Sequence, residues 1–256
     1  METTAQMVRS ARRRSSLTAR DLAALAGVSP SLVSRAEAGK VTPSADAYRS
    51  LLRAAGFMDA GGSLAPLSRP SALWAARWLL GDLDAAPPQF DEWVATWLRA
   101  GLVASDGVNV PDADSLAFRA GRMAVLSARP EAVPVATPML AQQIANRLAS
   151  EGIEYALSGD EALMRYGSAI VPSWPVLYVT SVQSAVDALG VRPVLPSERG
   201  PRALLIPFDG RSEAGRSDEF DGLWFVGRLQ AALDGYAGDG RMVEQAQVVM
   251  DGWRRA

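Results

Sequence analysis

The chain has 256 residues and a formal net charge of −2, with 48% hydrophobic and 21% charged residues but neither histidine nor cysteine. Without these two residue types, a zinc site, a disulfide framework and the usual pairs of a nucleophile with a histidine are excluded. Its one lysine, Lys40, follows no Gly-rich phosphate loop, and no stretch reaches the ~18–20 apolar residues of a membrane span. We therefore expect a cytoplasmic protein without a secretory signal, a metal or a cofactor, in which carboxylate catalysis is the enzyme chemistry left open.

Charge is distributed unevenly along the chain. Residues 1–56 hold nine Lys/Arg against four Asp/Glu, whereas the remaining two hundred residues hold seventeen against twenty-four. A basic end on an acidic body is typical of a protein that meets a polyanion with one domain only. Chance clustering on a solvated helix is the alternative that charge alone leaves open.

The segment 17–39, LTARDLAALAGVSPSLVSRAEAG, predicts two short helices joined by a tight turn. Thr18 and Asp21 have the spacing of a capping box, and Gly27 can end the first helix with a positive φ. Ser29 then caps the second helix. Apolar residues recur on the inward face of both helices at three- and four-residue spacing. Two short helices with this turn form a helix-turn-helix.

The run from Val8 to Gly56 resembles the Cro/C1-type (Xre-like) helix-turn-helix domain. The resemblance rests on the pattern L-[ST]-x-x-[DE]-L-A-x-x-x-G-V-S-x-S-x-V-S-R-x-E-x-G and on the Pro-Ser pair that follows it. It implies five helices, of which the one over 29–38 enters the major groove of DNA. A helical domain used only for protein contact is the alternative. The DNA-contacting residues implied by the resemblance are Thr18, Arg20, Ser29, Pro30, Ser31, Ser34, Arg35, Lys40 and Thr42.

The residues of this set are expected to divide between base reading and phosphate contact. Arg35 can grip the O6 and N7 atoms of a guanine, and Ser31 and Ser34 are expected to face base edges. The polar residues around the start of the first helix and after the second helix suit phosphate contacts, which position the domain without reading sequence. The resemblance also implies that Glu37 pairs inward with an arginine of the first helix, here Arg12, which favours a structural role for Glu37 over a role in recognition.

Residues 59–70 are rich in Gly, Ser and Pro and are expected to be a linker between a domain over 1–58 and a domain over 71–130. Two apolar helices are predicted in the second domain, followed by a hairpin around Asp106-Gly107. Helix, helix and hairpin together predict a winged helix. Because its second helix carries two acids and one arginine, a structural or dimerising role is favoured over auxiliary DNA contact.

From Pro138 onward, strand and helix patterns alternate, which predicts an α/β domain over 131–256 with a partly buried sheet. The fold class is therefore multidomain, all-α at the front and α/β at the back. The expected helices cover 139–152, 159–167, 181–190 and 242–255, and the expected strands cover 153–158, 175–180, 191–195, 203–208 and 223–227.

The C-terminal half resembles antitoxins of the AbiE-type (type IV) toxin–antitoxin family. The resembling segments include IEYALSGDEALMRYG, PVLYVTS, ALGVRPVL and the ending WFVGRLQAALDGYAGDGRMVEQAQVVM. The resemblance implies a degenerate nucleotidyltransferase fold, repression of the protein's own promoter and a toxin as genetic partner. The Cro/C1-like domain in front departs from the winged helix that this family commonly carries.

An active nucleotidyltransferase would need two acids, one residue apart, on the strand after its Gly-Ser loop, because these acids hold Mg²⁺. Here SGDEAL could stand for the loop, but the next strand, VLYVTS, has no carboxylate. We therefore expect no enzyme. The acids expected in a solvated loop, with no metal or catalytic use, are Asp209, Glu213, Asp218, Glu219 and Asp221. The residues expected in the core, with an effector pocket as the alternative, are Tyr155, Tyr166, Tyr178 and Trp224.

The sequence thus predicts a transcriptional repressor of antitoxin type that binds double-stranded DNA as a homodimer on an inverted repeat. It would be cytoplasmic, and associated with the nucleoid when bound to DNA. A toxin partner and a role in phage defence come from the resemblance alone. The first alternative is a stand-alone regulator whose C-terminal half senses a ligand or a partner protein. A nucleotidyltransferase guided to DNA is less favoured.

Overall fold

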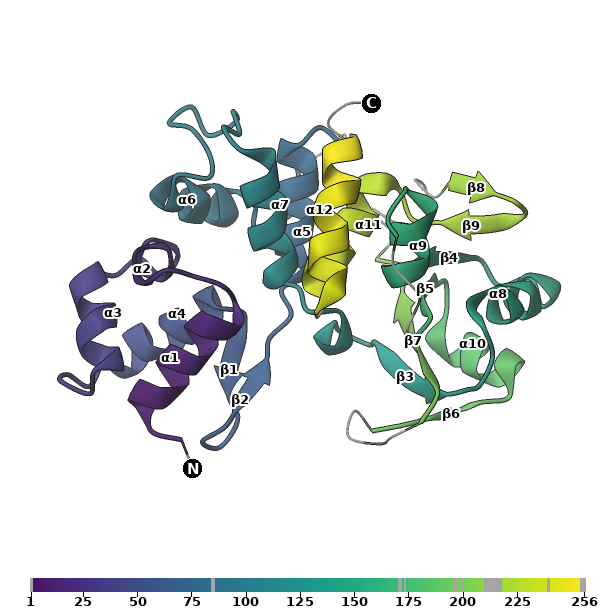
Figure 1. Cartoon of the computed structure of the whole chain (residues 1–256), viewed down its shortest axis with the longest axis horizontal. Coiled ribbons are helices and arrows are strands. Elements are labelled where there is room, and N and C mark those ends of the chain that lie inside the picture. The colour runs from purple at the N-terminus through teal and green to yellow at the C-terminus, as the bar shows by residue number, and fades with distance from the viewer. Residues whose placement is uncertain are drawn as a thin grey trace. The chain divides into compact units, whose positions relative to one another are not determined.

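The structure is a computed structural model that describes residues 2–83, 86–169, 172, 174–195, 198, 200–209, 218–238 and 240–253. The chain divides into two compact units, Met1–Ala128 and Arg129–Ala256 (Figure 1). This division falls close to the boundary expected between residues 130 and 131, and none falls in the expected linker. Within the described residues, no helix is both long enough and apolar enough to cross a lipid bilayer.

The N-terminal unit begins with the predicted helix-turn-helix. Thr18 and Asp21 form a capping box at the start of α2, and Gly27 ends α2 with a φ of 69°. The Ser29 hydroxyl accepts a hydrogen bond from the N–H of Leu32 at 3.2 Å and caps α3. These helix ends agree with the prediction because each is fixed by residues that are close together in the sequence. The first four helices are α1 (Thr4–Arg14), α2 (Ala19–Ala26), α3 (Pro30–Glu37) and α4 (Ala45–Ala54).

The segment for which the resemblance implied five helices contains four among the described residues, and a two-stranded antiparallel sheet follows α4. β1 (Phe57–Asp59) pairs with β2 (Leu64–Pro66). Gly56, just before β1, has a φ of 76°, and a Cβ atom on it would stand 2.6 Å from the carbonyl oxygen of Arg122. Only glycine fits this conformation and this close approach, so the chain leaves the helix here. The expectation of five helices in this segment is therefore wrong.

The segment 59–70, expected to be a linker, is part of the packed N-terminal unit. Ser68 forms an antiparallel bridge with Ala124, and the N–H of Arg69 donates to the carbonyl oxygen of Met123 at 2.8 Å. Beyond this segment, α6 (Phe90–Ala100) packs against α2, and α5 (Pro70–Leu79) packs against α7 (Ala113–Arg122). The 3₁₀ turn η1 (Leu126–Ala128) ends the unit.

Residues 101–112, all of which the structure describes, hold no strand. The Asp106 carboxylate instead accepts hydrogen bonds from the N–H groups of Val108 and Asn109, at 3.0 and 2.9 Å. Such side-chain bonds satisfy the backbone locally and compete with a strand ladder. The predicted hairpin is therefore wrong, and the expected winged helix lacks its wing. The unpredicted helix α7 follows, capped by Asp112.

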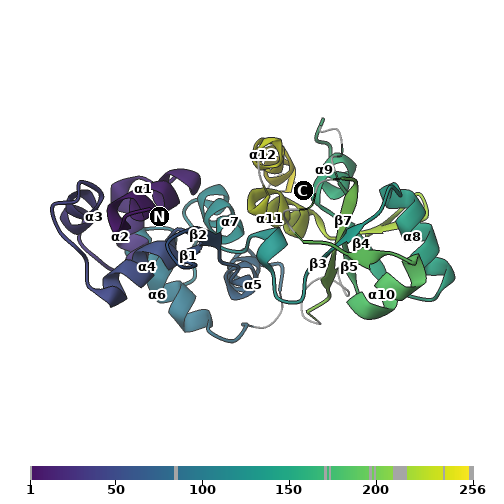
Figure 2. The same cartoon turned by 90° about the horizontal axis from the view of Figure 1, so that it is seen from below.

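A mixed seven-stranded sheet forms the centre of the C-terminal unit within the described residues. Its strand order is β6-β3-β7-β5-β4-β9-β8, with β4 and β5 antiparallel and β5 and β7 parallel. The inner strands are buried because helices cover both faces (Figure 2). The strands are β3 (Val133–Ala136), β4 (Tyr155–Ser158), β5 (Val176–Val179), β6 (Arg192–Pro193), β7 (Arg202–Pro207), β8 (Asp218–Phe220) and β9 (Leu223–Phe225).

The helices of this unit cover the sheet in two layers. α8 and α10 lie on one face, and α9, α11 and α12 lie on the other (Figures 1 and 2). A Cβ atom on Gly235 of α11 would stand 2.7 Å from the Cβ of Ala246 in α12, so these two helices pack closely. The helices are α8 (Ala141–Ser150), α9 (Gly159–Arg165), α10 (Val182–Leu189), α11 (Arg228–Ala237) and α12 (Arg241–Trp253).

The strand and helix patterns read from residue 139 onward are confirmed, although the segment 191–195 forms only the two-residue strand β6. Three elements were not predicted. β3 contains Pro134, which weakens a strand pattern, and β8 lies in the acidic stretch expected to be a loop. α11 is buried from Leu229 to Ala237, so it shows no polar face that would mark it as an amphipathic helix.

The acidic stretch 209–221 is only partly described. Asp218 and Glu219 belong to β8 and not to a loop, and the Asp218 carboxylate accepts a hydrogen bond from the Tyr166 hydroxyl at 2.8 Å. Asp221 has a φ of 51° in the turn between β8 and β9. Glu213 lies outside the described residues.

Candidate DNA-binding surface

The helix α3 lies at the periphery of the N-terminal unit (Figure 1). Its inward face is fixed by two apolar side chains, Val33 and Ala36, which are at most 1% exposed. Because side chains three and four residues apart share a helix face, burial of these two leaves Ser31, Ser34 and Arg35 exposed. The predicted base-reading residues thus lie on the outer face of α3.

An ion pair between α1 and α3 sets the orientation of this helix. The Arg12 guanidinium donates to both carboxylate oxygens of Glu37, at 2.6 and 3.0 Å, and Arg9 donates to the Glu37 carbonyl oxygen. The hydrogen bond to Glu37 raises the pKa of Arg12 against the opposing effect of burial. The predicted Arg12–Glu37 pair is confirmed, and it turns the acidic charge of α3 inward.

The acid of α2 is also paired. The Asp21 carboxylate accepts from the N–H of Thr18 at 3.1 Å and forms an ion pair with Arg119 of α7 at 3.4 Å. Burial lowers the pKa of Arg119, and the charge of Asp21 acts in the opposite direction. Arg119 also donates to the carbonyl oxygens of Ser15 and Ser16, so one arginine ties α7 to the α1–α2 corner.

All nine predicted DNA-contacting residues are exposed. The hydroxyl groups of Ser29 and Ser31 lie 3.1 Å apart, and Ser34 donates to the carbonyl oxygen of Pro30 at 3.1 Å. Hydrogen bonds thus link the four members at the start of α3. The other members lie at the start of α2, in the last turn of α3 and in the segment after α3, and they are Thr18, Arg20, Arg35, Lys40 and Thr42.

The cations of this set are available for an external anion. Arg20, Arg35 and Lys40 form no ion pair with any residue that the structure describes. Around them, the acids Asp21 and Glu37 are both held by arginines. The surface therefore carries cations whose charge is not cancelled by an adjacent carboxylate, which is the electrostatic requirement for contact with phosphates.

Sequence reasoning missed two arginines at this surface. Arg119 comes from α7, and its pairing with Asp21 joins positions 98 residues apart in the chain. Arg99 comes from α6, and its Nε lies 3.8 Å from where a Cβ on Gly27 would stand, beside the turn between α2 and α3. Neither position carries a local signal: the packing of α6 against α2 brings Arg99 there, and the hydrogen bonds of Arg119 to Ser15, Ser16 and Asp21 hold it there.

The helix α6 does not present a second cationic surface. Asp91 and Glu92 are exposed in its first turn. Glu92 pairs with Arg69 at 2.9 Å, and the same guanidinium lies 4.2 Å from the ring centroid of Trp93. Because the side chains of Trp93 and Trp97 are buried, the aromatic stripe of α6 is core.

In the C-terminal unit, the segment that could stand for a nucleotide-binding loop is part of a buried polar cluster. Asp234 is fully buried and accepts hydrogen bonds from Arg129, Ser158, Tyr178 and Gln230, the last at 2.8 Å. The Ser158 hydroxyl is thus engaged in the core. Buried charges persist where they are paired and hydrogen-bonded, so this cluster is explained as structure.

The four aromatic residues considered for an effector pocket divide into two pairs. Tyr178 is buried in the Asp234 cluster, and Tyr166 donates to Asp218 and to the carbonyl oxygen of Val226. Burial raises the pKa of Tyr166 above its ordinary value. The other two, Tyr155 and Trp224, line a pocket at one end of the sheet.

Comparison with known proteins supports the N-terminal site. Residues 5–61 match a protein family described as a helix-turn-helix domain. No curated protein and no solved structure has a significant match to the chain. Together with the exposed cations around α3, the match supports a DNA-binding regulator of transcription of the helix-turn-helix class.

Proposed function

We propose that the protein is a sequence-specific regulator that places α3 in the major groove of double-stranded DNA. The single observation that carries this proposal is the arrangement of α3: its apolar face is buried, its acid is paired with Arg12, and Arg35 is exposed without an ion pair in the described part of the chain. The planar guanidinium of Arg35 suits the O6 and N7 atoms of a guanine.

The hydroxyl groups around Arg35 have different hydrogen-bonding capacities. Ser34 uses its donor on the Pro30 carbonyl, so in this arrangement it offers lone pairs to the amino group of an adenine or a cytosine. Thr18 accepts from the N–H of Asp21 at 3.1 Å, which leaves its hydroxyl hydrogen for a phosphate oxygen. Arg20, Lys40 and Thr42 complete the phosphate contacts.

The active species that we propose is a cytoplasmic homodimer, associated with the nucleoid when bound to DNA. A dimer engages two half-sites of an inverted repeat about 34–36 Å apart, one helical turn of DNA. The resemblance of the C-terminal half to AbiE-type antitoxins supports an autoregulating repressor with a toxin as genetic partner and a role in phage defence. We propose no enzymatic activity, since β5 carries no acid beside the Ser158–Asp160 turn.

A specific observation favours the alternative of a stand-alone regulator that senses a ligand. The C-terminal unit contains an open pocket of about 410 Å³ that includes Tyr155 and Trp224. Pockets of roughly 300–1,000 Å³ are typical for small molecules. The two functions are separated by the genomic neighbourhood, since a toxin gene next to this gene favours the antitoxin.

The proposal is tested by selecting bound sequences from a random duplex library with the full chain and then measuring affinity for the best site. Arg35→Ala should lower that affinity by ~1–3 kcal/mol and relax discrimination at one base pair. Arg53→Ala, which removes an exposed arginine from α4, is the matched control and should leave the preference at that base pair unchanged. Equal loss on all sequences for Arg35→Ala would refute its role in reading a base.

A further inference from the structure

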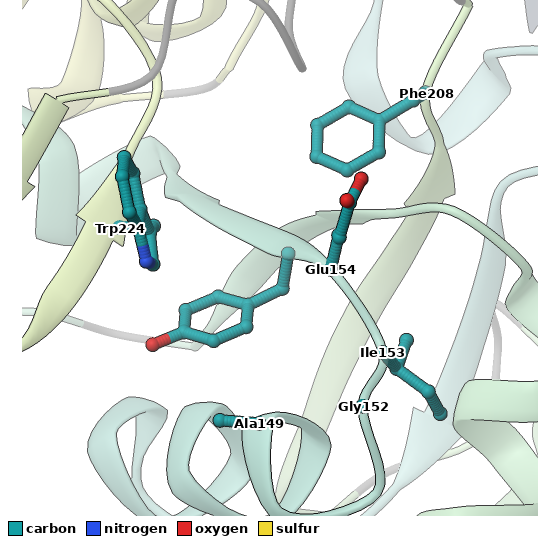
Figure 3. Close-up of a pocket in the computed structure, with 7 residues that line it drawn as sticks. Ala149, Gly152, Ile153, Glu154, Phe208 and Trp224 are labelled. Carbon is teal, nitrogen blue, oxygen red and sulfur yellow. The ribbon is translucent and has the colours of Figure 1, made fainter.

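A pocket opens at the end of the sheet where β4 begins (Figure 3). Its volume is about 410 Å³. Trp224 lies on one side of it, and Phe208 lies on the other with the carboxylate of Glu154 beside its ring. We call it the β4 pocket, and its lining residues are Ala149, Gly152, Ile153, Glu154, Tyr155, Phe208 and Trp224.

The strand directions explain why residues 149–155 meet residues from two distant stretches of the chain here. β4 runs antiparallel to β5, and β5 runs parallel to β7, so the start of β4 lies beside the ends of β5 and β7. Two backbone hydrogen bonds fix this end: Thr180 donates to the Glu154 carbonyl at 3.2 Å, and Phe208 donates to the Val179 carbonyl at 2.9 Å. The pocket is therefore built on strand ends and not on a single loop.

Three of the lining side chains are aromatic, and two of them have fixed surroundings. The Phe208 ring stacks on the buried ring of Tyr178, with a centroid distance of 6.1 Å and an interplanar angle of 19°. Tyr155 is 6% exposed, whereas Trp224 is 44% exposed. An indole that remains this exposed at the mouth of a pocket is available to cover a ligand.

The pocket is acidic as well as aromatic. Glu154 is exposed and has no ion pair with any described residue. On the neighbouring strand, Glu219 stands directly opposite Trp224 in the β8–β9 ladder. Because directly opposite residues of an antiparallel pair share a face of the sheet, Glu219 lies on the same face as Trp224. Burial raises the pKa of the Tyr155 hydroxyl, a backbone hydrogen bond at Trp224 opposes this effect, and the charge of Glu219 adds to it. No described lysine or arginine lines the pocket.

We propose that the β4 pocket binds a small organic cation, an ammonium or guanidinium compound with apolar substituents. The faces of aromatic rings attract cations, and indole is the best of them. The Glu154 carboxylate adds charge complementarity, and the described lining residues include no basic group for a phosphate or a carboxylate ligand. The pocket volume fits a compound larger than a simple amine.

The observations favour a free small molecule over the basic side chain of a protein. The pocket is concave, and its other lining residues are small or apolar, namely Ala149, Gly152 and Ile153. Such a lining encloses the substituents around a quaternary nitrogen, and this shape is the one that aromatic sites for quaternary ammonium groups use. Binding of such a ligand does not require any residue of the DNA-binding surface.

The proposal is tested by calorimetric titration of the full chain with choline, with its uncharged isostere 3,3-dimethylbutan-1-ol and with the larger cation benzyltrimethylammonium. We expect at least one of the two cations to bind. Where choline binds, its affinity should be about tenfold higher than that of the alcohol, because the two compounds differ only in charge. Equal affinity of choline and the alcohol, or no binding of either cation, overturns the proposal.

Variants locate the site. Trp224→Ala should weaken binding of the cation about tenfold and Glu154→Gln several-fold, while Glu244→Gln, an exposed carboxylate on α12 outside the lining, should leave it unchanged. Trp224→Phe retains an aromatic face and should recover part of the affinity even if Trp224→Ala impairs folding. Unchanged affinity in both Glu154→Gln and Trp224→Phe overturns the assignment of the cation to this pocket. DNA affinity, measured on the same variants, is a separate readout.

Discussion

Two arginines, Arg35 and Arg129, one from each unit, use their charges in opposite ways. In the N-terminal unit, Arg35 is exposed and has no ion pair with any described residue. In the C-terminal unit, Arg129 is 7% exposed and is paired with Asp234, which is fully buried. A cation in water can neutralise an external phosphate, whereas a buried cation requires an internal counter-charge. The comparison indicates that Arg35 keeps its charge for a partner, whereas Arg129 uses its charge for the fold of its own unit.

The carboxylates sharpen the same contrast. Near the helix-turn-helix, Asp21 and Glu37 are turned toward Arg119 and Arg12. In the C-terminal unit, Glu154 lines an aromatic pocket whose described lining residues include no arginine, and Glu219 stands opposite Trp224 in the β8–β9 ladder. The surface around α3 thus keeps its two nearby carboxylates paired, while the C-terminal unit leaves the carboxylate of Glu154 unpaired among the described residues beside a cavity. This difference predicts partners of opposite charge for the two units.

The largest expected effect comes from breaking the buried pair. Asp234→Ala should lower the free energy of unfolding by ~3–5 kcal/mol, because it leaves the Arg129 charge buried without its counter-charge. Asp234→Asn should cost less, since an amide retains part of the hydrogen bonding to Ser158 and Tyr178. Urea unfolding followed by circular dichroism measures both. The control is Asp187→Asn, which changes an exposed acid on α10. If Asp234→Ala lowers the free energy of unfolding as little as this control does, the comparison is contradicted.

The second effect tests the pair that orients α3. Glu37→Gln should lower the free energy of unfolding by ~1–3 kcal/mol, because the two side chains are only 20% and 12% exposed. DNA affinity should fall with it, since α3 loses its fixed orientation. The control is Asp46→Asn, whose ion pair with Arg49 is exposed to solvent, and its loss should stay below ~0.5 kcal/mol. If Glu37→Gln unfolds like wild type, the pair does not orient α3.

The third effect concerns the exposed cations. Lys40→Ala should weaken binding to every duplex and reduce the dependence of log K on log salt by about one, because one phosphate contact is lost. Stability should not change, since Lys40 makes no ion pair with a described residue. Affinities measured by fluorescence anisotropy at several salt concentrations give the slope. A slope equal to that of wild type removes Lys40 from the phosphate contacts.

The smallest effect is a pH dependence in the C-terminal unit. Burial and the neighbouring Asp160 raise the pKa of Glu161. Since its pKa is higher in the folded than in the unfolded state, its contribution to stability is present at acid pH and is lost as the pH rises through the folded value. Glu161→Gln should therefore stabilise the protein at pH 7 by less than ~1 kcal/mol and have no such effect at low pH. Thermal unfolding at both pH values, with Glu244→Gln as control, checks this; stabilisation that is equal at both values would contradict it.

The elements that the sequence predicted best have ends fixed by local chemistry. The capping box of Thr18, the positive φ of Gly27 and the cap at Ser29 each involve residues at most three positions apart. The Arg12–Glu37 pair was also predicted, but from the family pattern and not from local chemistry. The exposed set on α3 follows in turn from the apolar spacing of Val33 and Ala36.

The errors lie where distant contacts overrule local composition. Residues 59–70 look like a linker, yet they form a hairpin and a bridge because Ala124 and Met123 lie beside them. The stretch 101–112 alternates like a hairpin, but hydrogen bonds to the Asp106 carboxylate satisfy its backbone. α11 was missed because both sides of it are buried, which removes the polar face that marks a helix.

The sequence by itself determined the helix-turn-helix, the inward and outward faces of α3 and the excess of positive charge at the N-terminal end, because caps, periodicity and charge are properties of neighbouring residues. Only the tertiary structure decided that Arg119 forms an ion pair with Asp21 and that Asp234 accepts hydrogen bonds from four side chains. It also decided that Glu154, Phe208 and Trp224 line one pocket. Each of these groupings joins segments far apart in the chain. Their proximity is set by helix packing and by strand order, which no local pattern encodes.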